Sequence, residues 1–202
     1  MNMPEHEFSP LESLQLIRSM IDKTKEVMYD KSAYFLLWGW GTFVASLAQF
    51  ILKVVYNYPY HYRVWILVFV YYFISRIMSR RQKKTQQTET YVRESVKFLW
   101  IGISISFFVS YSIFSKIGWQ YCYPIYMLLY GLGGFVTGKY LKFKPLIYGG
   151  LISSLLGGVS VWFDFDYQML FACGALLASY IIPGHMLRSE FQKSKKQMPS
   201  IN

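Results

Sequence analysis

The stretch Arg76 to Lys97 reads RIMSRRQKKTQQTETYVRESVK and stands between two long apolar runs. Transferring so many cationic side chains across a bilayer is very costly, and anionic lipid headgroups on the cytoplasmic leaflet attract them. We therefore expect this stretch to be a cytoplasmic connection between two membrane-spanning helices. Its basic residues, which orient the whole predicted chain, are Arg76, Arg80, Arg81, Lys83, Lys84, Arg93 and Lys97.

The composition agrees with a membrane protein. Of the 202 residues, 53% are apolar, 20% are aromatic and only 16% are charged, whereas soluble domains average about 25% charged residues. The net charge of +10 is of a size that nucleic-acid-binding proteins also carry. Here the basic residues flank apolar runs and do not alternate with stacking aromatics. We therefore expect a bilayer with anionic headgroups as partner, and no nucleic acid.

Six apolar segments have about the length needed to cross roughly 30 Å of hydrocarbon. The predicted fold is an all-α, six-helix transmembrane bundle preceded by an amphipathic cytoplasmic helix. The organisation is then an amino-terminal helix in residues 1–33, a transmembrane domain in 34–187 and a basic cytoplasmic tail in 188–202. The spans run from about Tyr34 to Val55, Val64 to Met78, Phe98 to Phe114, Trp119 to Tyr140, Leu146 to Trp162, and Tyr167 to Leu187, the last broken by Pro183 and Gly184.

The distribution of charge supports this number of spans. With six spans both termini are cytoplasmic, and all of the 21 Lys and Arg residues except Lys53, Arg63 and Lys116 fall on the cytoplasmic side. This is the bias that the positive-inside rule describes. The predicted location is a bacterial cytoplasmic (inner) membrane, crossed several times, with both termini inside.

The amino-terminal region has the pattern of an amphipathic helix. Ser9 and Glu12 fit a capping box around Pro10, and Leu14 and Ile17 begin an apolar face that continues at helical spacing. We expect this helix to lie on the bilayer surface or under the bundle, with docking of a cytoplasmic protein partner as the alternative.

Small residues recur at the spacing that lets helices approach closely in lipid. The fourth span has Gly134 and Gly138 with Gly131 one turn earlier, and the fifth has one stripe of Gly149, Ser153 and Gly157 beside another of Gly150, Ser154 and Gly158. Close packing is the favoured interpretation, and a substrate path is the other. The second span lacks this pattern, so we expect it at the periphery and the fifth span at the centre.

The search for chemistry is mostly negative. The chain has no zinc-protease, serine-elbow or phosphate-loop motif, and its two cysteines, Cys122 and Cys173, cannot build a disulfide framework. No Asp, Glu, Arg or His lies in the middle of a predicted span, which disfavours proton-coupled transporters and intramembrane enzymes. We expect no cofactor, no metal and no catalytic residue.

Two groups of residues are candidates for binding. The first would contact anionic lipid or a partner at the cytoplasmic face, and the second would supply polar groups to a cavity in the bundle. The first group is Arg80, Arg81, Lys83, Lys84, Lys139, Lys142, Lys144 and Arg188, and the second is Gln49, Ser153, Ser154 and His185.

Three motifs carry a resemblance to a known family. They are Trp38-Gly39-Trp40 at the start of the first span, the run from Leu129 through Lys142-Phe143-Lys144-Pro145-Leu146, and Ile182-Pro183-Gly184. In these the chain resembles an uncharacterised family of small polytopic integral membrane proteins from Bacteroidota. Members are often encoded beside a small winged-helix regulator, so the resemblance implies a regulated envelope function and supplies no catalytic residue.

The leading hypothesis for function is a non-enzymatic membrane interaction component or an envelope stress or regulatory component. The alternative is a small transporter or channel acting as a homo-oligomer, since six spans with few polar groups barely enclose a path. A lipid-modifying membrane enzyme, with His185 as acid or base, is third. A wet cavity in the bundle would favour transport, and a dry interior would favour interaction.

Overall fold

The computed structural model describes residues 10, 11, 13–19, 32–81 and 91–197, and these residues form helices and turns without any strand. The all-α prediction is therefore confirmed for this part of the chain. Residues 10, 11 and 13–19 are helical. The elements that follow are α2 (Ser32–Phe50), η1 (Ile51–Val55), η2 (His61–Ile66), α3 (Leu67–Arg81), α4 (Tyr91–Ile117), η3 (Trp119–Tyr121), α5 (Cys122–Tyr140), α6 (Lys144–Ser160), α7 (Phe165–Leu176), η4 (Leu177–Ile181) and α8 (Ile182–Gln197).

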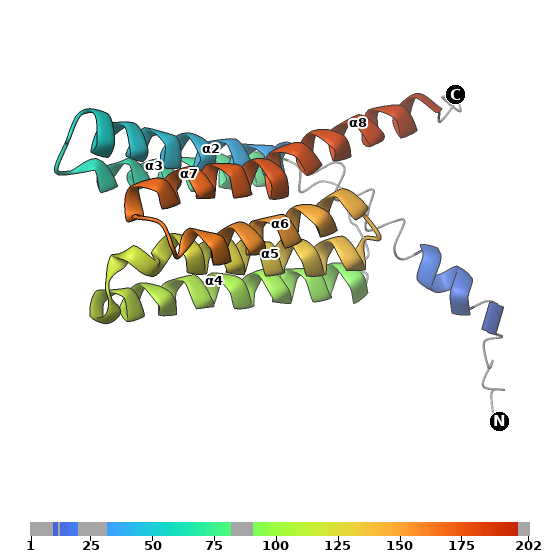
Figure 1. Ribbon diagram of the computed structural model, residues 1–202. Coiled ribbons are helices and arrows are strands. Elements are labelled where there is room, and N and C mark those ends of the chain that lie inside the picture. Colours follow the sequence, from blue (N-terminus) through green and yellow to red (C-terminus); the bar gives the residue numbers. More distant parts are fainter. Residues whose placement is uncertain (1–9, 12, 20–31, 82–90, 198–202) are drawn as a thin grey trace.

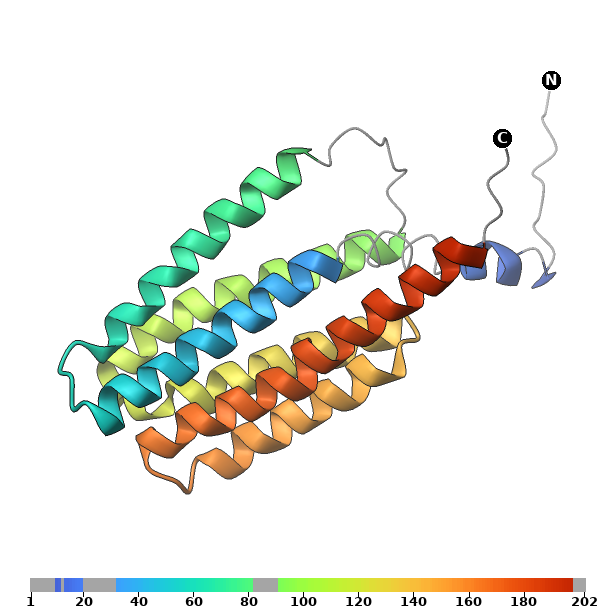
Figure 2. The same ribbon diagram turned by 90° about the horizontal axis from the view of Figure 1, so that it is seen from above.

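The long helices run side by side in two layers, with α2, α3 and α7 to α8 in one and α4, α5 and α6 in the other (Figure 1). The two layers meet where α6 packs on α7 and η4. Within the first layer, α2 packs on α7. The turn between α5 and α6 lies at the same end as the start of α4 and the end of α3 (Figures 1 and 2). The connections from α2 to α3, from α4 to α5 and from α6 to α7 lie at the opposite end (Figures 1 and 2).

Within the described part of the chain, three helical segments are long and apolar enough to cross a membrane: Leu36–Val55, Glu94–Ile117 and Phe165–Ser189. The other predicted spans correspond to η2 with α3, to η3 with α5, and to α6. These are shorter or richer in Gly and Tyr, with α3 having 15 residues and α6 having 17.

Glycine shapes the most extensive helix contact, which joins α5 to α6. A Cβ added to Gly131 would lie 2.6 Å from the carbonyl oxygen of Gly150, and one added to Gly138 would lie 2.7 Å from the backbone nitrogen of Ile147. Both distances are shorter than van der Waals contact, so no side chain fits there. Close packing is therefore confirmed for these positions. It does not extend to Gly158 or Gly102, where an added Cβ would meet nothing within 4 Å.

The sequence suggested that the fifth span is central. The structure differs, because α6, which corresponds to this span, lies at the edge of its layer (Figure 2). One face packs on α5, α7 and η4, while Tyr148, Leu151 and Leu155 on the other face are exposed. The two small-residue stripes of this span had suggested that other helices pack on both of its faces. The second span is peripheral, as expected: α3 packs on α2 and η2 and diverges from the other helices (Figure 2).

The predicted break at Pro183 and Gly184 is also wrong, because the helix continues through them to Gln197. Proline cannot donate a backbone hydrogen bond, and its ring crowds the preceding turn. The wider π-helical turn η4 directly before Pro183 gives that ring room, so the chain stays helical. The segment 188–197, predicted as part of a tail, is likewise helix.

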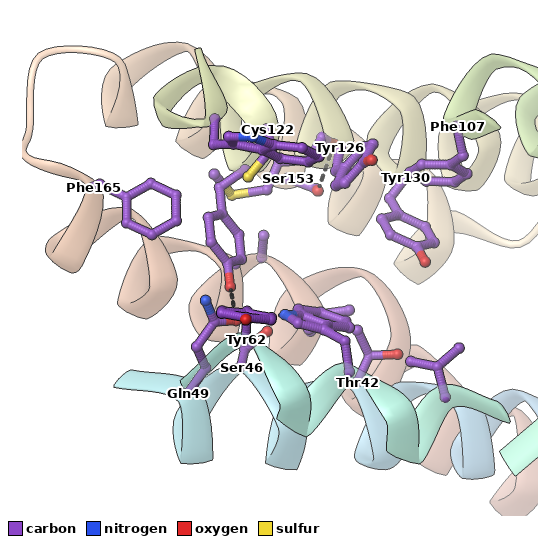
Figure 3. Close-up of a pocket in the computed structure, with 18 of the residues that line it drawn as sticks. Thr42, Ser46, Gln49, Tyr62, Phe107, Cys122, Tyr126, Tyr130, Ser153 and Phe165 are labelled. Carbon is purple, nitrogen blue, oxygen red and sulfur yellow. Dashed lines mark hydrogen bonds between the residues drawn. The ribbon is translucent and has the colours of Figure 1, made fainter. Parts of the chain in front are cut away.

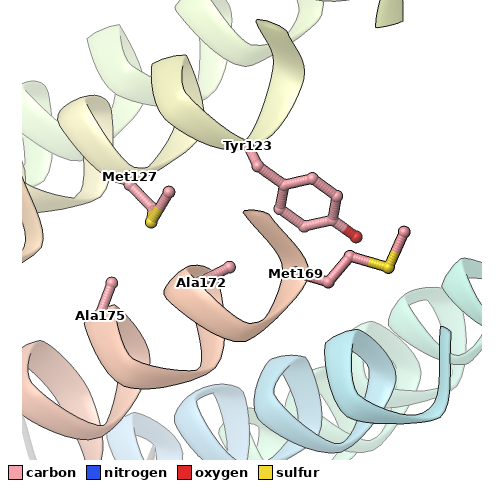
Figure 4. Packing of buried hydrophobic residues seen from close by; sticks show 5 residues of the cluster. All are labelled: Tyr123, Met127, Met169, Ala172 and Ala175. Carbon is pink, nitrogen blue, oxygen red and sulfur yellow. The ribbon is translucent and has the colours of Figure 1, made fainter. Parts of the chain in front are cut away.

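A buried apolar cluster joins α5 to α7 near the end opposite the α5–α6 turn (Figure 4). Met127 of α5 and Met169 of α7 form its centre, together with Tyr123 and the small residues Ala172 and Ala175. This cluster fixes the position of Tyr123, whose hydroxyl reaches toward α2 and the site described next.

Candidate functional site

A cavity of about 870 Å³ lies between the two layers, and Figure 3 shows part of its wall. Aromatic rings make up much of the lining, and no Asp, Glu, Lys or Arg belongs to it. The lining residues are Trp38, Thr42, Ser46, Gln49, His61, Tyr62, Trp65, Val68, Phe107, Tyr111, Trp119, Cys122, Tyr123, Tyr126, Met127, Tyr130, Ser153, Phe165, Ala172, Ala175, Leu176 and Ser179.

Gln49, on α2, is the centre of a hydrogen-bond network in this wall. Its side chain is 3% exposed, and its Oε1 accepts hydrogen bonds from the indole Nε1 of Trp65 and from the Tyr123 hydroxyl, the latter at 2.8 Å. Two donors on one oxygen fix the amide orientation, so Nε2 points to Nδ1 of His61 at 3.2 Å. The network supplies hydrogen bonds to the buried Gln49 amide, which without them would destabilise the packing of α2 against η2 and α5.

His61 completes this network from η2, in the turn outside the predicted spans. Because Gln49 Nε2 can only donate, Nδ1 of His61 accepts and the ring proton lies on Nε2. Partial burial and the nearby Lys53 lower the pKa of His61, while Asp166 opposes them. The neutral imidazole that the hydrogen bond needs is therefore the favoured form.

Lys53 and Asp166 form an ion pair beside this network. The Lys53 ammonium also lies 4.4 Å from the centre of the Phe165 ring, which is part of the cavity wall. The charges of Lys53 and Asp166 therefore compensate each other beside the cavity wall.

Thr42, Ser46 and Gln49 form a polar stripe on the cavity side of α2 (Figure 3). The Thr42 hydroxyl donates to the Trp38 carbonyl at 2.7 Å. The Ser46 hydroxyl, in a residue that is 1% exposed, has no hydrogen-bond partner among the residues that the structure describes. A buried polar atom without a partner is uncommon, and one that lines a cavity is a place where a bound molecule can supply the missing bond.

Packed aromatic residues lie next to the cavity, toward the cytoplasmic end of the predicted topology. The Tyr180 ring of η4 stacks edge-on against Tyr130 of α5, with ring centres 5.4 Å apart, and against Trp100 of α4 at 6.2 Å. Gly39 of α2 lets this residue approach, because an added Cβ would lie 3.0 Å from the Tyr180 Cβ. Four elements thus meet around one side chain.

Of the four polar residues predicted to line a cavity, the structure brings Gln49 and Ser153 together in its wall. The Ser153 hydroxyl donates across the helix pair to the Met127 carbonyl at 3.0 Å. Ser154 lies outside the lining and donates to Gly150 of its own helix at 3.1 Å. His185 is exposed and accepts a hydrogen bond from Trp40 Nε1 at 3.3 Å, away from the cavity.

The structure describes part of the basic group that was predicted to contact anionic lipid or a partner. Lys139, Lys142 and Lys144 are exposed around the α5–α6 turn, and Arg188 is exposed on α8. A small core of Leu141, Phe143, Leu146 and Leu187 holds that turn against α8, so these four cations share one end of the protein. Arg80 and Arg81 lie in the last turn of α3, and Lys83 and Lys84 fall outside the described residues.

Sequence reasoning missed Ser46, His61, Trp65 and Tyr123. Thr42, Ser46 and Gln49 have the i, i+4, i+7 spacing of one helix face, a signal that could have identified the stripe. No comparable signal links Trp65, Tyr123 and His61, because they come from separate elements. Comparison with known proteins adds no further guide, since no family model, curated protein or solved structure matches the chain. The resemblance to a Bacteroidota family therefore stays a prediction.

Proposed function

We propose that this chain is an integral membrane protein that crosses a bacterial cytoplasmic membrane six times and binds an uncharged small molecule in its central cavity. Three helices have the length and apolarity of spans. Between the second and third of them, α5 and α6 form a hairpin that runs to the other end of α4 and back (Figure 1). A bilayer that surrounds α4 and α7 therefore surrounds this hairpin as well.

The cavity lining carries the proposed binding function. Its volume of about 870 Å³ is within the usual range for small-molecule sites, and it combines aromatic walls with a few fixed polar groups. A charged ligand would find no opposite charge in the lining and would lose its hydration. The proposal is therefore a non-enzymatic binding or transport component for a neutral molecule, acting as a monomer or a homo-oligomer.

The two native cysteines allow a direct test of cavity access. Cys122 lines the cavity, whereas Cys173 is buried outside the lining, with its sulfur 3.9 Å from the Phe43 carbonyl. In lipid nanodiscs, the small uncharged reagent methyl methanethiosulfonate should modify Cys122 much faster than Cys173. A panel of uncharged solutes, each screened at saturating concentration, should contain members that protect Cys122 and raise the melting temperature.

Equal reaction of the two thiols, or a panel in which no solute protects Cys122, would overturn the binding proposal. Flux of the protecting solutes into liposomes then separates transport from binding alone. Mass photometry of the same sample gives the oligomeric state.

A second candidate function rests on a separate observation, the exposed apolar side chains of the amino-terminal helix. Leu11, Leu14, Leu16 and Ile17 all leave at least 45% of their surface uncovered. With the cytoplasmic cations, these side chains would contact anionic lipid or a cytoplasmic protein partner. Deleting residues 1–30 should then abolish sedimentation with anionic vesicles or partner pull-down while leaving the melting temperature unchanged, and unaltered binding would refute this candidate.

The third hypothesis, a lipid-modifying enzyme, gains no support from the position of its best candidate. His185 lies outside the cavity lining, and it accepts a hydrogen bond from the Trp40 indole.

A further inference from the structure

Residues of both α3 and α4 line the cavity, although these two helices have no extensive contact with each other among the described residues. Val68 of α3 and Phe107 and Tyr111 of α4 line it from the two sides. Among the described residues, however, α3 packs mainly on α2 and η2, while α4 packs on α5 and η3. In the proposed topology this side faces the hydrocarbon of the bilayer.

The hydrogen-bonding groups of the cavity are not spread evenly. Gln49 and His61 lie toward the end where α2 and η2 meet, and Ser46 is one turn along α2. Each has a hydrogen to offer: the second amide hydrogen of Gln49, the Nε2 proton of His61, and the hydroxyl of Ser46, which has no partner. The wall beyond them is mostly aromatic and aliphatic.

We propose that the cavity binds a neutral amphiphile from the bilayer, with its uncharged oxygen-bearing headgroup at Ser46, Gln49 and His61 and its hydrocarbon chain along the aromatic wall. The chain leaves the cavity between α3 and α4, and this is also the route of entry. This inference rests on the proposed binding function and adds the ligand class and its orientation.

The charges around the cavity favour a neutral headgroup over a charged one. Two ionised side chains beside the cavity wall, Lys53 and Asp166, already pair with each other. A phosphate or carboxylate would have to break that pair to gain a cationic partner. A hydroxyl or an ester carbonyl needs only the donors of Ser46, Gln49 and His61, and the Ser46 hydroxyl gains the bond it lacks.

The test uses the full chain in nanodiscs with a monoacylglycerol probe that carries a diazirine in the middle of its acyl chain. After illumination, peptide mapping by mass spectrometry locates the probe. We expect saturable labelling of peptides containing Val68 and Phe107, displaced by unlabelled monoolein. Oleate, which has the same chain and a charged headgroup, should compete about tenfold more weakly. This corresponds to a difference in binding free energy of about 1.4 kcal/mol.

Matched variants test the route and the headgroup contact. Val68→Trp fills the α3–α4 side and should reduce labelling about tenfold, while Phe69→Trp, at an exposed neighbour outside the lining, should leave it unchanged. Ser46→Ala removes one hydrogen bond and should weaken monoolein competition several-fold, by about 1 kcal/mol. Melting temperatures of all variants confirm that the fold is intact.

Labelling that monoolein does not displace, or that maps only to peptides with outward residues such as Tyr148 and Leu155, would overturn the inference. So would equal competition by oleate, or equal effects of Val68→Trp and Phe69→Trp. If a water-soluble uncharged solute still protects Cys122 in that case, the inference fails and the binding function stands. If nothing protects Cys122, both fail.

Discussion

The α5–α6 interface and the α3–α4 side are built from opposite kinds of residue. Glycines on α5 and α6 let the two backbones touch, so that an added Cβ on Gly131 would lie 2.6 Å from a carbonyl oxygen. On the other side, rings such as Phe107 and Tyr111 face a cavity of about 870 Å³. In lipid, apolar side chains gain little from leaving the solvent, so close association depends on the fit of the surfaces. Glycine supplies that fit, and large rings without complementary grooves leave space.

The largest expected effect comes from forcing the tight interface apart. Gly150→Leu places a side chain against Phe135 and against the Gly131 carbonyl, which is 2.6 Å from the ideal Cβ. We expect destabilisation of about 3 kcal/mol or more. Gly158→Leu on the same helix meets open space and should change stability by less than about 0.5 kcal/mol. Thermal unfolding in detergent measures both, and equal losses would show that the interface is not tight.

A smaller loss should follow from removing the polar centre of the open side. Gln49→Leu leaves the donors of Trp65 and Tyr123 without their acceptor, at an expected cost of about 2 kcal/mol. Tryptophan emission should shift as well, because the Trp65 indole loses its hydrogen bond. Gln120→Leu, which removes an exposed amide in the turn after α4, is the control and should have almost no effect. A stable Gln49→Leu protein with unchanged emission would contradict the network.

Ser46→Ala should act in the other direction. The hydroxyl is buried without a partner, so its removal should stabilise the ligand-free protein by about 1 kcal/mol. Ser153→Ala is a suitable comparison, since that hydroxyl donates to the Met127 carbonyl and its loss should destabilise. A decrease in melting temperature for Ser46→Ala would mean that this hydroxyl already has a partner.

The smallest expected effect is a dependence on pH through His61. Its pKa is lowered from 6.5, so at neutral pH the ring is neutral in both the folded and unfolded protein. Below pH 6.5 the unfolded protein binds the proton first, and stability should fall until the folded pKa is reached. His61→Gln should remove this part of the pH dependence. If the melting temperature of the native protein rises as the pH falls below 6.5, and that of His61→Gln does not, the predicted direction of the pH effect is wrong.

Local signals located much of the fold. The fourth predicted span ends at Tyr140, as α5 does, because the lysines and the proline of the following turn mark the end of an apolar run. Glycine spacing also identified Gly131 and Gly138 as contact positions. The same spacing could not show that a Cβ added to Gly158 would meet no described residue within 4 Å, because the pattern repeats on adjacent faces and only the neighbouring helix selects one.

The site was predictable only in its separate parts. Gln49 stood out as a polar residue in an apolar run, and Ser153 as part of a small-residue stripe. Their relation to His61, Trp65 and Tyr123 depends on how η2 and α5 come to lie against α2. That arrangement follows from long-range packing, which no local pattern encodes.

The sequence by itself determined the helical class and the gathering of basic residues at particular connections, since both follow from the chemistry of short segments in a solvent. Only the tertiary structure decided which glycines touch, that Pro183 stays within a helix, and that an uncharged cavity separates the two layers. These depend on the shapes of surfaces that meet from distant parts of the chain. A cavity is the volume that such surfaces fail to fill, and no single segment specifies it.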